Sequence, residues 1–146
     1  MAMYKKGKYW YGESLDDTRT EVVRFSRKNG YEATRFSTSI CECGGRDFKL
    51  ETDEDAGAGR RICARCNRVV LMADSAEYAD EADFDNHVCV CDEEKFEVLS
   101  GVALYENSTD VRWYYIGCKC TKCNLVGVFA DWKCEAGDAE EFLSKT

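Results

Sequence analysis

The sequence predicts a mainly β protein with one N-terminal helix, in which two small three-stranded antiparallel units follow one another as copies of an internal repeat. The first observation is the repeat itself: the segment RICARCNRVVLMAD at 61–74 returns within IGCKCTKCNLVGVFADWK at 116–133, each with a Cys-x-x-Cys-Asn. The second is that a Cys-x-Cys pair precedes each of these, in ICECGGRDFKL at 40–50 and VCVCDEEKFEV at 88–98. The third is that the segments around the cysteines are rich in β-branched and aromatic residues, which favour strands.

The size and cysteine content of the chain fit this organisation. A unit of about 50 residues buries little apolar surface and usually needs a disulfide, a metal or a partner to be stable. This 146-residue chain contains 10 cysteines. No segment approaches the roughly 20 apolar residues that cross a bilayer, and the basic N-terminus lacks the apolar core of a secretory signal. We therefore expect a cytoplasmic protein with no membrane segment, and in that reducing compartment cysteine pairs are more often metal ligands than disulfides.

The net charge of -8 is unevenly distributed. Residues 1–40 carry eight basic and five acidic side chains, whereas 74–97 carry ten acidic side chains and one basic. An acidic belt repels phosphate, so a protein with a basic surface is a more favourable partner than nucleic acid. The repeat and the charge divide the chain into a basic, aromatic arm and helix (1–30), a first metal unit (31–74), an acidic linker (75–87), a second metal unit (88–134) and an acidic tail (135–146).

The N-terminal segment combines an aromatic arm with the single strongly predicted helix. The arm, 4–12, interleaves lysines with tyrosines and a tryptophan. This composition suits either the edge of a small core or a contact with nucleic acid. The helix spans 14–30, because Ser14 and Asp17 form a capping box, basic residues lie in the last turns and Gly30 ends it.

Alternating or β-branched segments predict the strands. They are 31–40, 46–52, 60–63 and 68–73 in the first unit, and 96–105, 111–116 and 125–132 in the second. We expect the strand at 31–40 to enter the first metal unit, and Gly101 to form a β-bulge in the long strand of the second. The linker and the tail have little apolar content, and we expect no more than a short helix in each.

The four cysteine pairs are predicted to bind two structural zinc ions. Zinc takes four ligands in a tetrahedron, with sulfur at about 2.3 Å. Two cysteines so close in sequence converge only if the chain turns sharply after the second, and the residues found there are types that tolerate a left-handed backbone: Gly44, Asn67, Asp92 and Asn124. Nineteen residues separate the two pairs of the first unit and 28 those of the second, so each unit is expected to close its own site. The predicted ligands are Cys41, Cys43, Cys63 and Cys66 for one ion and Cys89, Cys91, Cys120 and Cys123 for the other.

Other assignments of the cysteines stay open. Ligands interleaved between the units would use the same eight residues, and a rubredoxin-like iron site would also use four thiolates. A disulfide within a Cys-x-Cys pair would be strained. Cys118 is an alternative ligand to Cys120, although it aligns with Arg61 of the first copy. We interpret Cys118 and Cys134 as free thiols, and His87, the one histidine, as a surface or turn residue.

Over residues 31–132 the arrangement resembles the zinc-ribbon group, here as a tandem double zinc ribbon. The cysteine pairs differ from the commoner CPxCG form because they lack proline and begin with Cys-x-Cys. The C-terminal half also resembles a family of small acidic bacterial proteins of unassigned role, through ALYE at 103–106, DVRW at 110–113 and ADWK at 130–133. The zinc-ribbon resemblance implies ribbon-like antiparallel units folded by metal, and the second resemblance implies no activity.

The predicted function follows from closed metal sites. Four thiolates leave zinc no free coordination position, so the ion would fold the chain and would not catalyse a reaction. We therefore expect a non-catalytic protein-interaction module, such as an adaptor, inhibitor or immunity-type protein, whose acidic surface binds a basic partner. One alternative is a nucleic-acid-binding ribbon that uses the basic aromatic N-terminal segment. Another is an unrecognised enzyme or a thiol redox protein that uses Cys118 and Cys134.

Overall fold

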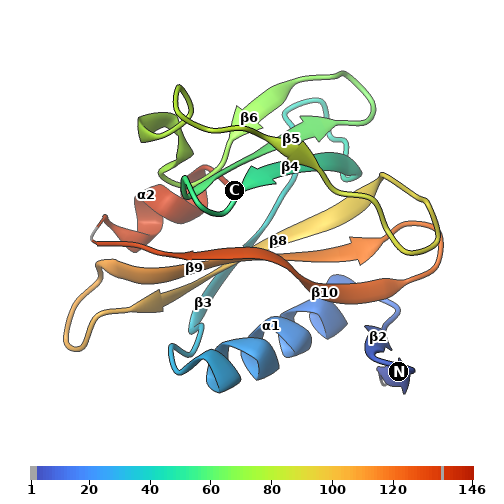
Figure 1. Ribbon diagram of the computed structural model, residues 1–146, viewed down its shortest axis with the longest axis horizontal. Helices are drawn as coiled ribbons and strands as arrows, with labels where there is room; N and C mark the ends of the chain where they lie inside the picture. The colour runs from blue at the N-terminus through green and yellow to red at the C-terminus, as the bar shows by residue number, and fades with distance from the viewer. Residues whose placement is uncertain (1–2, 136) are drawn as a thin grey trace.

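The structure is a computed structural model that describes residues 3–135 and 137–146. Met1 and Ala2 of the predicted arm and Ala136 of the predicted tail lie outside the described residues. The fold is mainly β with one long helix, as predicted (Figure 1). The helical elements are α1 (Leu15–Asn29), the short 3-10 turn η1 (Ser75–Glu77) and α2 (Ala139–Ser144). The strands are β1 (Tyr4–Lys6), β2 (Tyr9–Tyr11), β3 (Arg35–Thr38), β4 (Phe48–Asp53), β5 (Ala58–Cys63), β6 (Val69–Leu71), β7 (Asp85–Asn86), β8 (Phe96–Leu104), β9 (Val111–Cys120) and β10 (Leu125–Lys133).

The two copies of the repeat share one sheet. Its strand order is β1-β2-β10-β9-β8-β4-β5-β6, with β3 and β7 attached to β8 and β4. In each unit the strands are β8, β9 and β10 or β4, β5 and β6, in chain order. The first strands of the two units, β8 and β4, lie next to each other, and the third strands, β10 and β6, lie farthest apart. The copies meet at one pair of equivalent residues, Phe48 of β4 and Phe96 of β8. The internal repeat of the sequence thus becomes an approximately symmetric arrangement around this pair.

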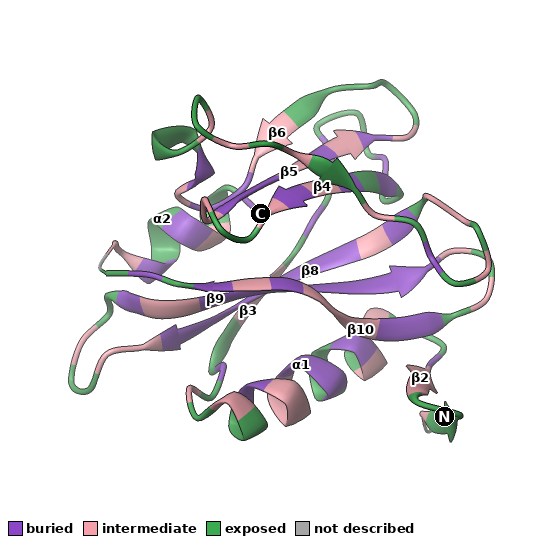
Figure 2. Ribbon diagram, viewed as in Figure 1, coloured by how far each residue is buried: buried purple, intermediate pink, exposed green. Residues whose placement is uncertain are grey.

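The elements form three layers, with α1 on one face of β8–β10 and the first unit on the other (Figure 1). Alternate residues of β9 point to opposite layers: Tyr114 and Ile116 belong to the core between the two units, and Tyr115 belongs to the core under α1. Figure 2 shows the buried stretches of β8 and β9 at the centre of the molecule. Because both faces of β9 are covered, its residues from Tyr114 to Cys120 are all buried.

The helix α1 packs closely on the sheet because glycines lie beneath it. A Cβ atom at Gly117 would lie 2.5 Å from Val22 Cγ2. The helix ends at Gly30, whose φ of 88° is left-handed, as predicted. Its N-terminus differs in part from the predicted capping box. Ser14 is the N-cap but its side chain caps no backbone amide, whereas Asp17 Oδ2 accepts the Glu13 N–H at 2.8 Å.

Two details of the predicted strands are wrong. The strand predicted at 31–40 forms at Arg35–Thr38, but it pairs with β8 of the second unit and not with the first. Gly101 lies in regular pairing with Tyr115, and the irregularity of β8 falls between Ala103 and Leu104. A Cβ atom at Gly101 would lie 3.1 Å from side-chain atoms of both Phe36 and Val22, so close packing accounts for this glycine.

The arm and the linker are both attached to the sheet. The arm is a hairpin in which β2 extends β10 by pairing Tyr11 with Leu125 and Trp10 with Val126. The linker contributes η1 and β7, and β7 pairs with β4. The tail forms the short helix α2. Among the described residues, none of the helices has the length and apolar character needed to span a membrane.

Candidate metal centres

The fold gathers eight cysteines into two groups of four, and these are the two groups expected from the repeat. Within each group the sulfur atoms all lie within 4.8 Å of one another. Sγ–Sγ distances in the first group are 3.5 Å for Cys41–Cys66 and 3.6 Å for Cys43–Cys63. The repeat-equivalent distances in the second group are 3.6 Å for Cys89–Cys123 and 3.5 Å for Cys91–Cys120. Ligands at 2.3 Å from a tetrahedral zinc ion would lie about 3.8 Å apart, so both groups have the size of a four-thiolate metal site.

The turns that aim the sulfurs use the predicted left-handed residues. Positive φ angles occur at all four positions: 88° at Gly44, 64° at Asn67, 75° at Asp92 and 68° at Asn124. Each of these residues follows the second cysteine of a pair and lets the chain reverse there at little steric cost. Each of the four turns is therefore explained by the type of residue that follows the cysteine pair.

The same hydrogen bonds close equivalent turns in the two copies. The Gly44 N–H donates to the Cys41 carbonyl at 2.8 Å, and the Asp92 N–H donates to the Cys89 carbonyl at 2.8 Å. Backbone amides also point at the sulfurs of the Cys-x-x-Cys pairs, from Arg65 to Cys63 Sγ and from Lys122 to Cys120 Sγ, both at 3.4 Å. Such amides stabilise thiolates, which are the form of cysteine that binds a metal.

The strands hold each site at the end of a hairpin. Cys63 closes β5 and pairs with Phe48, while Cys120 closes β9 and pairs with Phe96. These two phenylalanines are fully buried and pair with each other. The first hairpin of each unit is thereby anchored in the common core. The second cysteine of each Cys-x-x-Cys pair, Cys66 or Cys123, is more exposed than the first and lies toward the surface.

The surroundings of the two sites differ in charge. Arg61 is only 6% exposed and lies beside the first site, where its Nε donates to the Thr146 carbonyl at 2.9 Å. Burial lowers the pKa of Arg61, and the nearby Cys41 and Cys63 thiolates oppose that effect. Burial would raise the pKa of Cys63, but hydrogen bonds from backbone amides and neighbouring thiols bring it down to about 6. The position equivalent to Arg61 in the second copy is Cys118, so the second site lacks this cation.

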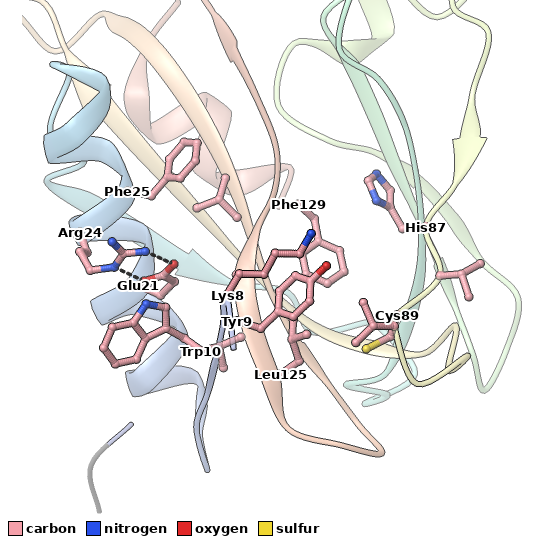
Figure 3. Close-up of a pocket in the computed structure, with 15 residues that line it drawn as sticks. Lys8, Tyr9, Trp10, Glu21, Arg24, Phe25, His87, Cys89, Leu125 and Phe129 are labelled. Atoms are coloured by element: carbon pink, nitrogen blue, oxygen red, sulfur yellow. Dashed lines mark hydrogen bonds and ion pairs between the residues drawn. The ribbon is translucent and has the colours of Figure 1, made fainter. Parts of the chain in front are cut away.

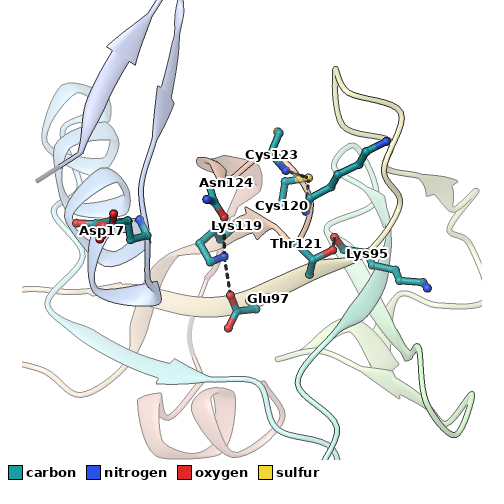
Figure 4. A network of polar contacts seen from close by, with 10 residues as sticks. Asp17, Lys95, Glu97, Lys119, Cys120, Thr121, Cys123 and Asn124 are labelled. Carbon is teal, nitrogen blue, oxygen red and sulfur yellow. Dashed lines mark hydrogen bonds and ion pairs between the residues drawn. The ribbon is translucent and has the colours of Figure 1, made fainter. Parts of the chain in front are cut away.

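A buried lysine supports the second site instead (Figure 4). Lys119 is 7% exposed, and its Nζ lies 2.9 Å from Glu97 Oε2 and 3.2 Å from Asn124 Oδ1. Asn124 is the left-handed residue that follows Cys123, so the ion pair holds the side chain of a residue at the turn. This network was not anticipated from the sequence. The signal available was a lysine at the position equivalent to Ile62, which lies in the strand predicted at 60–63 of the first copy.

The remaining cysteines and the histidine lie outside both groups. Cys118 and Cys134 are free and buried, and burial raises the pKa of each thiol. Reactive thiols have lowered pKa values and solvent access, so neither residue has the surroundings of a redox or catalytic cysteine. His87 is half-buried: its Nε2 lies 2.7 Å from Thr52 Oγ1, and its ring packs against Phe129.

Comparisons of the chain with protein-family models, with curated proteins and with solved structures return no match. The assignment of two groups of four cysteines suited to metal ions thus depends only on the geometry of the chain.

Proposed function

We propose that the protein is a non-catalytic interaction module, folded by two structural zinc ions and presenting an acidic surface to a basic protein partner. The observation that carries the proposal is the closure of both sites by four cysteines. Four thiolates fill the tetrahedral coordination of zinc and leave no position for a substrate or a reactive water. Function then depends on contacts made by the surface that the metal ions hold in shape.

The surface we assign to the partner lies where the linker crosses the first unit. The Asp83 N–H donates to Asp53 Oδ2 at 2.9 Å, and β7 pairs with β4 through Thr52 and Asp85. These contacts bring acidic residues far apart in the sequence onto one shallow surface. Its carboxylates are those of Asp53, Glu54, Asp55, Asp83 and Asp85.

Charge reversal on this surface tests the proposal. Asp55, Asp83 and Asp85 are exposed and are replaced together by lysine, leaving the hydrogen bonds of Asp53 in place. The matched control reverses three exposed acids elsewhere, Glu13, Asp47 and Glu106, and so has the same net charge.

Both variants and the wild type, all zinc-loaded, are compared by affinity capture from host cells at low and high salt, without a chelator in the buffer. We expect basic proteins held by the wild type and the control at low salt to be absent from the Asp55/Asp83/Asp85 variant. Equal capture by the two variants would contradict the proposal.

The second candidate function is nucleic-acid binding, which is favoured by the basic residues that the fold gathers on the N-terminal hairpin and on α1. The hairpin exposes Lys5, Lys6 and Lys8, and Arg24 of α1 lies 5.5 Å from the ring of Trp10. Aromatic rings beside cations suit single-stranded nucleic acid. Replacing the three lysines with alanine should then lower the affinity for a single-stranded oligonucleotide and its salt dependence. Absence of binding by the wild type at low salt would remove this candidate.

A further inference from the structure

A groove runs along β10 between the N-terminal elements and the second metal unit (Figure 3). It has a volume of about 380 Å³, which is within the range of binding sites for small ligands or short peptide segments. Its floor is residues 125–129 of β10. One wall carries Trp10 of the hairpin and the Glu21–Arg24 pair of α1, and the other carries His87–Val90 at the first cysteine pair of the second unit.

The groove exposes apolar side chains that no described element covers. Val88 is 54% exposed and Val90 is 58% exposed, on either side of the buried Cys89. Trp10 and Phe129 are partly exposed on the opposite wall and the floor. Large apolar side chains grouped in one concave surface are typical of binding sites, because their exposure has a cost that a partner removes.

The floor of the groove is also an open strand edge. On the side away from β9, β2 pairs with β10 only at Leu125 and Val126. Further along the same strand, the Asp131 N–H donates to Glu54 Oε2 at 3.4 Å. Between these points, at residues 127–129, no strand among the described residues pairs with this side of β10. An unpaired edge offers backbone donors and acceptors to an added strand.

The charged groups of the groove favour an anionic ligand. Glu21 is bound by Arg24 through two contacts of 2.6 and 2.8 Å, so its negative charge is balanced. Lys8 is exposed and takes part in no ion pair among the described residues, and its Nζ lies 5.4 Å from the centre of the Tyr9 ring. Lys8 therefore gives the groove an unbalanced positive charge, although the net charge of the whole chain is -8.

We propose that this groove binds an extended peptide segment of a partner protein, which adds as a strand to the edge of β10 at residues 127–129. Alternate side chains of the segment would be apolar and pack against Trp10 and the valines of the opposite wall. An acidic side chain of the segment would pair with Lys8. Main-chain hydrogen bonds give such a complex its affinity, and the side-chain contacts give it specificity. The groove borders the acidic surface of the proposed function, because His87 lines both, but the carboxylates of that surface are not among the residues that line the groove.

The probe is a library of random heptapeptides displayed on phage and selected on the zinc-loaded full chain. Enriched peptides are synthesised and their affinities are measured by fluorescence polarisation. We expect apolar residues in alternation with at least one acidic residue. Two-dimensional NMR of the complex should shift the amide signals of residues 127–129.

Two variants test the groove independently. Replacing Val88 and Val90 with aspartate places two charges on one wall. Replacing Trp10 with alanine removes the aromatic side chain of the other wall and changes no residue next to a cysteine in the sequence. Each should weaken peptide binding by about tenfold or more. The control is Val69→Asp, because Val69 is 54% exposed and lies outside the groove. Metal content and circular dichroism verify that the variants are folded.

Several results would overturn the proposal: no enriched peptide, equal binding by the Trp10 variant and the wild type, or unshifted amides at 127–129. Binding of a single-stranded oligonucleotide that displaces an enriched peptide would assign the groove to nucleic acid and also overturn it. The Asp55/Asp83/Asp85 variant should bind the peptides as the wild type does. Failure of the acidic surface and failure of the groove are therefore distinguishable.

Discussion

Replacing Gly117 with alanine tests the close approach of α1 to the sheet. The added Cβ would lie 2.5 Å from Val22 Cγ2 and 3.0 Å from Thr18 Cγ2, whereas carbon atoms in contact prefer about 3.5 to 4.0 Å. The helix must move by roughly 1 Å or the side chains must leave their favoured rotamers, and overpacking of this kind costs about 1 to 3 kcal/mol. In a chain of this size we expect the melting temperature to fall by about 2 to 12 °C.

The matched control is Gly127→Ala on the neighbouring strand, where the nearest atom to the added Cβ is Phe129 Cε1 at 3.7 Å. Both changes reduce the entropy of the unfolded chain equally, so the difference between them measures the contact with α1. Thermal unfolding of the zinc-loaded proteins is followed by circular dichroism. A second change, Val22→Ala, should recover part of the loss in the Gly117 variant. Equal melting temperatures for the two single variants would refute the reasoning.

Three further predictions concern particular residues of the sites and the core. Asn124→Gly should retain the left-handed turn and the second metal ion, whereas Asn124→Val should destabilise the turn by about 1 to 2 kcal/mol, as measured by urea unfolding. Arg61→Leu should make the first site release its metal to a competing chelator at concentrations about tenfold lower and leave the second site unchanged, and equal release would contradict the charge argument. Burial raises the pKa of Asp74, so the folded protein holds this proton more tightly than the unfolded chain does, and the ionised carboxylate lowers stability above its folded pKa. Asp74→Asn should therefore raise the melting temperature at pH 7.5, and the gain should shrink as the pH falls through the raised pKa towards the ordinary value; a loss of stability at pH 7.5 would contradict this.

Features governed by local chemistry could be predicted from the sequence. The positions of the cysteine pairs follow from the repeat, and the turn after each pair follows from a glycine, asparagine or aspartate that tolerates a positive φ. The end of α1 at Gly30 has the same cause. These predictions succeeded because each depends on a few consecutive residues.

Features governed by long-range packing could not be predicted in this way. The pairing of Phe48 with Phe96 joins the two units, but a phenylalanine in a strand carries no information about its partner strand. The pairing of β3 with β8 could not be predicted for a similar reason, because the sequence of a four-residue strand does not specify the sheet edge with which it pairs. Gly101 was interpreted as a bulge because its local signal is the same as that of a glycine beneath a helix.

The central claim is that two closed four-cysteine sites hold zinc and thereby fold the chain. The most direct test is native mass spectrometry with elemental analysis of protein purified from its host without added metal. The account predicts two zinc ions per colourless chain, all ten cysteines reduced, and loss of the folded spectrum when a strong chelator removes the metal. A folded chain with disulfides and no metal, or a red protein that contains iron, would contradict it.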